Sequence, residues 1–194
     1  MSKVIYRLAS LALTALIVLP ANGQGTRSRD ADYFPRHEIH LEYGVPTIIE
    51  LTSTINQFKD ASGMRADNFK FSGAAGLGYN FFFTPSLSLG VYGGISYSSA
   101  EVYNSDRWLY RSEVTSYTFQ IAGTWTYWEK RAMECSSAVY LGISYLDESH
   151  DRDSIKFAYH ITALRFRYGE TIGGFAELGF GYRGLVNVGL SVKL

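Results

Sequence analysis

Hydrophobic and polar residues alternate along most of the chain that follows residue 36. The C-terminal segment, Leu185–Leu194, shows this alternation most clearly. Val186, Val188, Leu190, Val192 and Leu194 lie on one face, while Asn187, Gly189, Ser191 and Lys193 lie on the other. Because successive side chains of a β-strand point to opposite faces, this segment predicts a strand with one apolar side and one polar side.

Eight segments share this two-residue period and are predicted to be β-strands. They are His37–Val45, Phe69–Phe83, Leu87–Ser98, Thr115–Trp128, Ala138–Leu146, Ser154–Tyr168, Ile172–Tyr182 and Leu185–Leu194. The apolar faces of these segments contain no Asp, Glu, Lys or Arg, although charged residues make up 19% of the chain. A protein face in contact with lipid excludes charge in this way, which favours strands that cross a membrane.

The connections between the predicted strands alternate in length. Thr84–Ser86, Glu129–Cys135 and Gly169–Thr171 are short, whereas Pro46–Asn68, Tyr103–Tyr110 and Asp147–Asp153 are longer or more polar. Short periplasmic turns and longer extracellular loops are typical of outer membrane barrels. The predicted fold class is therefore all-β, an eight-stranded antiparallel up-and-down transmembrane β-barrel. Tyr182–Leu185 then falls on the extracellular side, where it must be a very tight turn.

Two local features add detail to this fold. In Ser154–Tyr168 the apolar residues change from odd to even positions, which predicts a bulge near Ala163 that turns Arg165 and Arg167 inward. In the first loop, Thr47–Glu50 has the spacing of a capping box. Ile48, Leu51 (or Thr52), Ile55 and Phe58 follow at helical spacing. They predict a short amphipathic helix packed on the barrel rim, or alternatively a plug or a partner-binding helix.

The first 36 residues read as a targeting region. Residues 1–23 combine Lys3 and Arg7 with the uncharged run Leu8–Leu19 and small residues near Gly23, which predicts a cleaved signal peptide. Residues 24–36 are then a periplasmic N-terminal segment, and residues 37–194 form the barrel. The formal net charge of zero gives no basic excess for nucleic acid. The single cysteine, Cys135, allows no internal disulfide and is predicted to be an inert turn residue.

Several of these segments together resemble the outer membrane β-barrel domain family of Gram-negative bacteria, which includes small eight-stranded proteins. They are His160–Gly169 (HITALRFRYG), Gly174–Gly184 (GFAELGFGYRG), the terminal strand, and His37–Val45 as the first strand. The resemblance implies a place in the cell outer membrane, with outer membrane lipid around the barrel. It also implies assembly by the outer-membrane insertion machinery, which reads a terminal strand that usually ends in an aromatic residue, whereas this chain ends in Leu194. The family has no single biochemical activity.

The polar faces of the strands carry the candidate site. The predicted lumen charge network, with a structural role, contains Glu177, Arg165, Arg167, Glu38, Glu42 and Lys193, and Lys70 and Lys156 also point inward. A symmetrical turn at Gly169–Thr171 puts Arg165 roughly opposite Phe175 and one diagonal step from Glu177. Pairing of the first and last strands brings Glu38 to Lys193. Eight-stranded interiors are just wide enough for side chains to fill, so these charges are expected to pair rather than line a pore.

Other candidate chemistry is weaker. His40 and His160 face the lumen, where hydrogen bonding is expected in preference to a metal site, because a site needs three or four convergent ligands. Ser149-His150-Asp151 reads as a solvated turn, since catalytic triads are assembled from separate segments. The expected protein is no enzyme and has no cofactor. It has a structural or surface-interaction role through Pro46–Asn68 and Tyr103–Tyr110. The alternatives are a narrow channel or porin, a soluble lipocalin-like barrel, and a lipid A-modifying enzyme.

Overall fold

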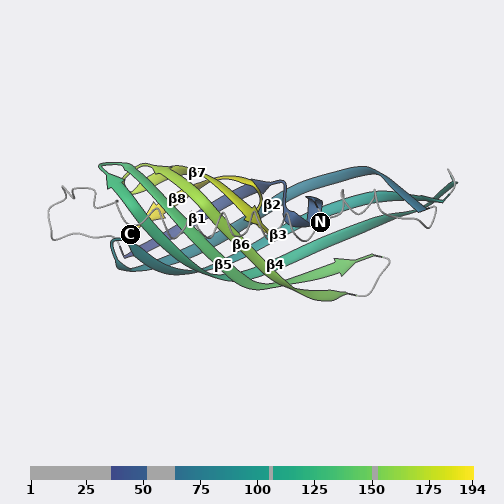
Figure 1. Cartoon of the computed structure of the whole chain (residues 1–194), viewed down its shortest axis with the longest axis horizontal. Helices are drawn as coiled ribbons and strands as arrows, with labels where there is room; N and C mark the ends of the chain where they lie inside the picture. Colours follow the sequence, from purple (N-terminus) through teal and green to yellow (C-terminus); the bar gives the residue numbers. More distant parts are fainter. Residues whose placement is uncertain (1–35, 52–63, 105–106, 150–152) are drawn as a thin grey trace, which may run out of the picture.

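The computed structural model describes residues 36–51, 64–104, 107–149 and 153–194, which fold into eight β-strands (Figure 1). The strands are β1 (His37–Val45), β2 (Met64–Thr84), β3 (Leu87–Asn104), β4 (Arg107–Lys130), β5 (Met133–Glu148), β6 (Ser154–Tyr168), β7 (Ile172–Gly181) and β8 (Val186–Lys193). Among the described residues, no helix is both long enough and apolar enough to cross a membrane. The predicted signal peptide, and all of the N-terminal segment before residue 36, lie outside the described residues.

The eight strands form one ring-like sheet. Each strand pairs antiparallel with the next in the chain, and β1 also pairs antiparallel with β8. The prediction of an all-β, up-and-down arrangement of eight antiparallel strands is confirmed. Short connections between β2 and β3, β4 and β5, and β6 and β7 gather at one end, which we call the turn end, and the C-terminus lies there as well (Figure 1).

Strand lengths differ strongly around the ring. β1 has 9 residues, β7 has 10 and β8 has 8, whereas β4 has 24. β1 pairs with β2 only up to Gly44↔Ala74, so Met64–Phe71 of β2 pairs with β3 alone. These residues, together with the ends of β3 and β4 that they adjoin, form an extension beyond the ring (Figure 1, right).

The extension corrects the predicted strand ends. Tyr103–Tyr110, predicted to be a loop, lies mostly in β3 and β4, and β2 begins at Met64 inside the predicted first loop. Where both faces of a sheet meet solvent, polar residues occupy both, so the alternation that reveals a strand fades. Cys135 lies in β5 and not in a turn, which also corrects the prediction. The bounds of β1 and β6 match the predicted segments.

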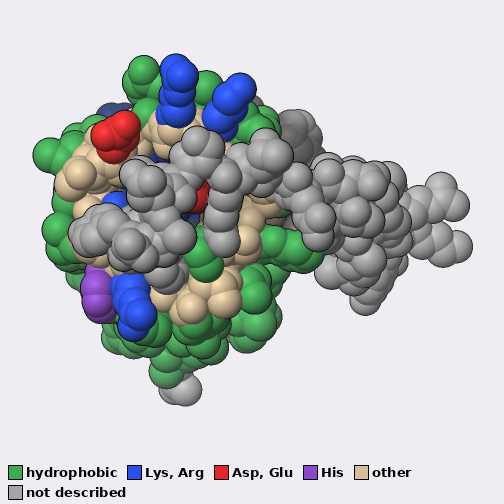
Figure 2. Space-filling model, turned by 90° about the vertical axis from the view of Figure 1, so that its left-hand side faces the viewer, with side chains coloured by type: hydrophobic (Ala, Val, Ile, Leu, Met, Phe, Trp, Pro, Cys, Tyr) green, Lys and Arg blue, Asp and Glu red, His purple; other side chains and the backbone are tan. Residues whose placement is uncertain are grey.

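Polar side chains, together with a smaller buried group around Tyr92 and Tyr140, fill the interior of the ring, and apolar side chains cover its outer surface. Along β1 the burial alternates strictly, with Glu38 and Glu42 buried and Ile39 and Leu41 exposed. The exposed apolar set continues around the ring with Leu77, Leu89, Phe119, Ile121, Ile143, Phe157, Leu178, Val188 and Leu190. Figure 2 shows hydrophobic side chains around the circumference and polar atoms nearer the middle. The faces predicted from the alternation are thus confirmed on these strands.

Register shifts interrupt the strand pairing at several places, and two of them bear on the interior. The register of β6 against both neighbours shifts at Ala163, which confirms the predicted bulge, and Arg165 and Arg167 are buried as a result. A second bulge lies in β2 between Phe71 and Ala74, where Gly73 has a φ of 68°. Only glycine adopts this conformation at little cost, so the bulge is located at that residue.

The predicted capping box is confirmed. The Thr47 N–H donates to Glu50 Oε2 at 2.7 Å, and the Glu50 N–H donates to Thr47 Oγ1 at 3.3 Å. Helical residues follow at 48–51, and the positions predicted to continue the helix, Thr52, Ile55 and Phe58, lie outside the described residues. The Glu50 carboxylate also accepts the N–H of Gly73 at 2.9 Å, so the helix start is fixed to the β2 bulge.

Candidate functional site

The interior of the ring is the candidate site, because it gathers most of the buried charge. Glu38 and Glu42 come from β1, Arg165 and Arg167 from β6, and Glu177 from β7. Each of these five residues is at most 4% exposed. Their inward direction follows from the two-residue period of each strand. The ring therefore brings together residues that are more than a hundred positions apart in the sequence.

Arg165 joins two of the carboxylates. Its Nη2 lies 2.9 Å from Glu38 Oε1, and its Nε lies 3.4 Å from Glu177 Oε1. The guanidinium carbon also lies 4.1 Å from the centroid of the Phe175 ring, within cation–π range. Arg165 therefore links β1, β6 and β7 across the interior.

The register between β6 and β7 differs from the predicted one. Arg165 lies directly opposite Glu177, while Phe175 lies opposite Arg167. The prediction assumed a symmetrical turn, but Tyr168 pairs with Gly174, and Ile172 and Gly173 pair with β8 only. This asymmetry shifts the pairing by two residues and replaces the predicted diagonal contact with a direct one.

Arg183 is a buried member of the interior charge network that the sequence did not reveal. It belongs to the connection between β7 and β8, yet its side chain is fully buried. Its Nε donates to Glu42 Oε1 at 2.6 Å, its Nη2 contacts Glu42 Oε2, and the same Nη2 lies 3.0 Å from Glu177 Oε2. Alternation assigns a face only to strand residues, so a residue in a four-residue connection gave no signal.

The charges form a continuous alternating series through the interior. Its order is Glu42, Arg183, Glu177, Arg165, Glu38 and Arg167. The last contact is the longest, with Arg167 Nε 3.7 Å from Glu38 Oε1. Each carboxylate in the series has a guanidinium neighbour, which is the arrangement that makes buried charge tolerable.

Lys193 meets a different partner from the predicted one. Its Cα is paired with that of Glu38 across the β1–β8 ladder, as expected. Its ammonium group instead contacts the Glu134 carboxylate on β5 and lies 5.2 Å from the Phe82 ring centroid. Glu38 is already engaged by Arg165, so the lysine reaches the next carboxylate along the turn end.

Arg167 fastens the turn end of the interior. Its Nε donates to Ser191 Oγ at 2.7 Å, and its Nη2 donates to the carbonyls of Glu170 and Thr171, both at 3.2 Å. Its Nη1 contacts the Gly169 carbonyl. One guanidinium therefore ties the β6–β7 turn to β8.

The predicted inward lysines lie outside the network. Lys70 and Lys156 are both exposed, which corrects the prediction. Lys156 precedes His160, the last residue of β6 that pairs with β7 at that end, and Lys70 precedes the part of β2 that pairs with β1. Their cross-strand partners, Ser99 and Ser144, are nevertheless buried, so it is the longer lysine side chains that reach solvent at these heights.

The two interior histidines are packed rather than hydrogen-bonded. Within the described part of the chain, neither ring nitrogen of His40 or His160 has a hydrogen-bond partner, which corrects the expectation. The His40 ring meets Phe175 edge-on at 5.9 Å, and His160 meets Tyr140 at 5.8 Å. Among the described residues no group of three or more His, Cys, Asp or Glu side chains is placed to hold a metal ion.

Outside the ring, the extension carries its own polar cluster. Glu101 Oε2 accepts hydrogen bonds from Asn68 Nδ2 at 3.0 Å and from the Tyr103 hydroxyl at 2.9 Å. These bonds hold the pKa of Glu101 below its usual value. Of the predicted solvated turn, Ser149 accepts the Glu113 N–H at 3.1 Å, while His150 and Asp151 lie outside the described residues. The extension is thus an ordered surface.

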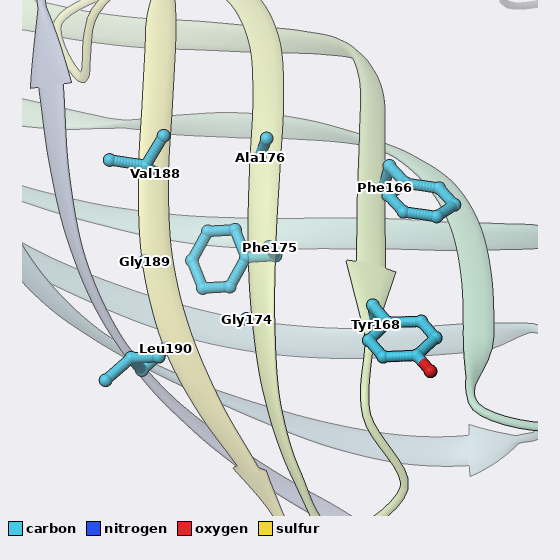
Figure 3. Close-up of a pocket in the computed structure, with 8 residues that line it drawn as sticks. All are labelled: Phe166, Tyr168, Gly174, Phe175, Ala176, Val188, Gly189 and Leu190. Carbon is cyan, nitrogen blue, oxygen red and sulfur yellow. The ribbon is translucent and has the colours of Figure 1, made fainter.

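A shallow apolar hollow lies on the outer surface over β6, β7 and β8 (Figure 3). Gly174 forms its floor, because a Cβ there would meet only the Gly189 carbonyl oxygen, at 3.9 Å. Tyr168 and Leu190, which pair with Gly174 on either side, flank it. No charged residue lines the hollow, but Phe175, which does line it, packs against Arg165 of the interior series.

No family model matches the chain, and neither the curated proteins nor the solved structures include a significant match.

Proposed function

We propose that the protein is an integral outer membrane β-barrel with a closed polar interior, which has a structural or surface-interaction role through its extension. One observation carries the proposal. The ring exposes large apolar side chains, such as Leu41 at 60% and Ile121 at 62%, while Glu38 and Arg183 inside it are 0% exposed. Contiguous apolar surface of this extent is unfavourable in water and favourable against lipid.

The same burial pattern argues against the soluble alternative. A lipocalin-like barrel needs an apolar interior for its ligand. Here the interior carries the charged series, with a few aromatic rings such as Tyr92 and Tyr140 packed against it, and the outer face carries most of the large apolar residues. Outer membrane lipid is therefore the proposed surrounding of the ring, and the outer-membrane insertion machinery the proposed partner in its assembly.

Side-chain packing supports a closed interior rather than a channel. Arg183, Tyr92 and Tyr140 lie together at mid-interior, with the guanidinium carbon 4.9 Å from one ring centroid and 3.9 Å from the other. All three are at most 2% exposed. The interior charges are paired, whereas a selective pore needs charges that remain available to ions.

The extension supports the surface-interaction role. At the end of its β3–β4 hairpin, Trp108 is 56% exposed and Leu109 is 38% exposed. Tryptophan is enriched among the residues that contribute most to protein–protein binding, so an exposed tryptophan on paired strands favours a protein-binding surface. With both termini of the barrel at the turn end, the extension points away from the periplasm and reaches the cell exterior.

Four measurements test the proposal and its alternatives. The protein should stay in the outer membrane fraction after alkaline washing and leave it only with detergent. It should also migrate differently in electrophoresis before and after heating. Release by washing alone would refute the membrane barrel.

Purified protein in planar bilayers should give no steady conductance, and regular conductance steps would favour the narrow-channel alternative. Unchanged lipid A mass profiles after gene deletion would argue against the lipid A enzyme.

A further inference from the structure

The residues that surround the Arg183 side chain have the composition of a ligand-binding site. Its walls come from four strands: Glu42 from β1, Tyr92 from β3, Tyr140 from β5 and Glu177 from β7. The arginine itself belongs to none of these strands, because it enters from the connection between β7 and β8. We call Glu42, Tyr92, Tyr140 and Glu177 the four-residue box.

The box matches the shape and charge of a guanidinium group. Glu42 takes two donors of the group through its two carboxylate oxygens, with Nε to Oε1 at 2.6 Å, and Glu177 takes Nη2 at 3.0 Å. Such forked carboxylate contacts suit the planar guanidinium better than an ammonium group. The Tyr140 and Tyr92 rings lie within cation–π distance of its carbon, at 3.9 and 4.9 Å.

The walls of the box are positioned independently of Arg183. Two interior glycines make room for Tyr92: a Cβ at Gly76 would lie 2.1 Å from its hydroxyl oxygen, and one at Gly94 would lie 2.5 Å from it. Tyr140 packs against Tyr92 at 6.2 Å between centroids and against His160 at 5.8 Å. Glu42 and Glu177 are fixed by the backbone pairing of β1 and β7.

Removing the Arg183 side chain would therefore leave a formed site with too much negative charge. Glu42 is 4% exposed, and its only other ion-pair contact among the described residues is with His40 Nε2 at 3.9 Å, a ring that is charged only when protonated. Buried carboxylates without a counter-ion are strongly unfavourable. A soluble cation that fits between the tyrosines would relieve this cost.

We propose that the four-residue box is a guanidinium-binding site that the chain fills with its own Arg183, and that it accepts a free guanidinium compound when this side chain is absent. The inference goes beyond the proposed function and does not depend on the membrane. In this view the Tyr182–Leu185 connection carries the Arg183 side chain as a covalently attached ligand. The connection is anchored beside the box by Tyr182 N–H to Tyr159 O at 3.1 Å and Leu185 N–H to Pro46 O at 2.9 Å.

The test is chemical rescue of Arg183→Ala in detergent micelles, with methylguanidinium chloride as the probe. Thermal unfolding is followed by circular dichroism, at ionic strength matched with sodium chloride. We expect a lowered unfolding midpoint that rises and saturates with the probe. Methylurea, the neutral planar analogue, should give no saturating rise, and methylammonium should give a smaller one.

Control variants separate the site from general effects. Arg111→Ala removes an exposed arginine, paired with Glu113 at 3.2 Å in the extension, and should show no saturable response. The double variant Arg183→Ala/Glu42→Gln should lose most of the rescue. Equal responses to methylguanidinium and methylurea would overturn the proposal, as would no response in folded Arg183→Ala. If Arg183→Ala does not fold, the same titration is made during refolding of Arg183→Ser, and failure to refold at any probe concentration would equally reject the site.

Discussion

Arg165 and Glu177 face each other directly across the β6–β7 pair, with Nε and Oε1 3.4 Å apart. Glu177 also accepts from Arg183 and, through its Oε2, from the Thr162 hydroxyl at 3.2 Å. It is therefore shared by two buried arginines, as Glu38 is by Arg165 and Arg167. In the series, Glu42 and Glu38 are the next carboxylates on either side of Glu177.

Glu177→Ala should strongly destabilise the protein, because it leaves two buried guanidiniums short of a counter-ion. Loss of one partner of a buried pair costs about 3–5 kcal/mol. Urea unfolding in detergent micelles measures the change. A double-mutant cycle with Arg165→Ala should give a coupling free energy well above the ~0.5 kcal/mol expected for independent sites. Additive effects would mean that the contact contributes nothing of its own.

Lys193 should be coupled more strongly to Glu134 than to Glu38, although its backbone partner is Glu38. Double-mutant cycles of Lys193→Met with Glu134→Gln and with Glu38→Gln compare the two carboxylates. We expect the larger coupling in the first cycle, since the ammonium group contacts Glu134 and the Glu38 carboxylate is held by Arg165. Stronger coupling in the second cycle would show that the predicted Glu38 contact exists in solution.

Val188→Arg should impair insertion or stability, because Val188 is 52% exposed on the outer apolar face. An arginine at the membrane midplane of a barrel costs about 2–4 kcal/mol. Ser191→Arg, at a buried interior position on the same strand, should act by crowding and also disturb the contact with Arg167. Refolding yields in lipid vesicles and in micelles distinguish the two effects. For Val188→Arg alone, the loss of refolding yield should be smaller in micelles than in lipid vesicles. Equal losses in both media would contradict the lipid-facing assignment of Val188.

Gly78→Ala should destabilise the interior, whereas Gly93→Ala should be nearly neutral. A Cβ at Gly78 would lie 2.1 Å from His40 Nε2, while one at Gly93 would have no atom within 4 Å. Overpacking typically costs about 1–3 kcal/mol. The unfolding midpoints of the two variants provide the measurement. Equal midpoints would show that the His40 ring moves aside freely.

The sequence could predict the parts of this structure that follow from a strict two-residue period. The inward positions of Glu38, Glu42 and Glu177 follow from it, and the change of phase at Ala163 revealed the bulge that buries Arg165. The contacts between these residues could not be predicted from the two-residue period alone. The β6–β7 register depends on an asymmetric turn, and a difference of two residues leaves the faces unchanged, so no pattern in the sequence distinguishes the two registers.

Three other features were missed for physical reasons. Arg183 sits in a connection where no alternation applies, and its burial depends on four strands meeting around it. The extension was not predicted because solvent on both faces of the sheet removes the contrast between an apolar and a polar face. Glu134 was missed because it was assigned to a turn, although β5 begins at Met133. In each case the missing information was three-dimensional packing rather than residue type.

The pairing of β1 with β8 has a kinetic consequence. The contacts that complete the ring join distant parts of the chain, with Arg165 and Glu38 127 positions apart and Arg183 and Glu42 141 positions apart. Contacts of such long sequence separation form slowly, because the entropy of closing the loop is lost before the contact stabilises it. Refolding should therefore show adjacent hairpins gaining protection from hydrogen exchange first, and the seam between the first and last strands gaining it last.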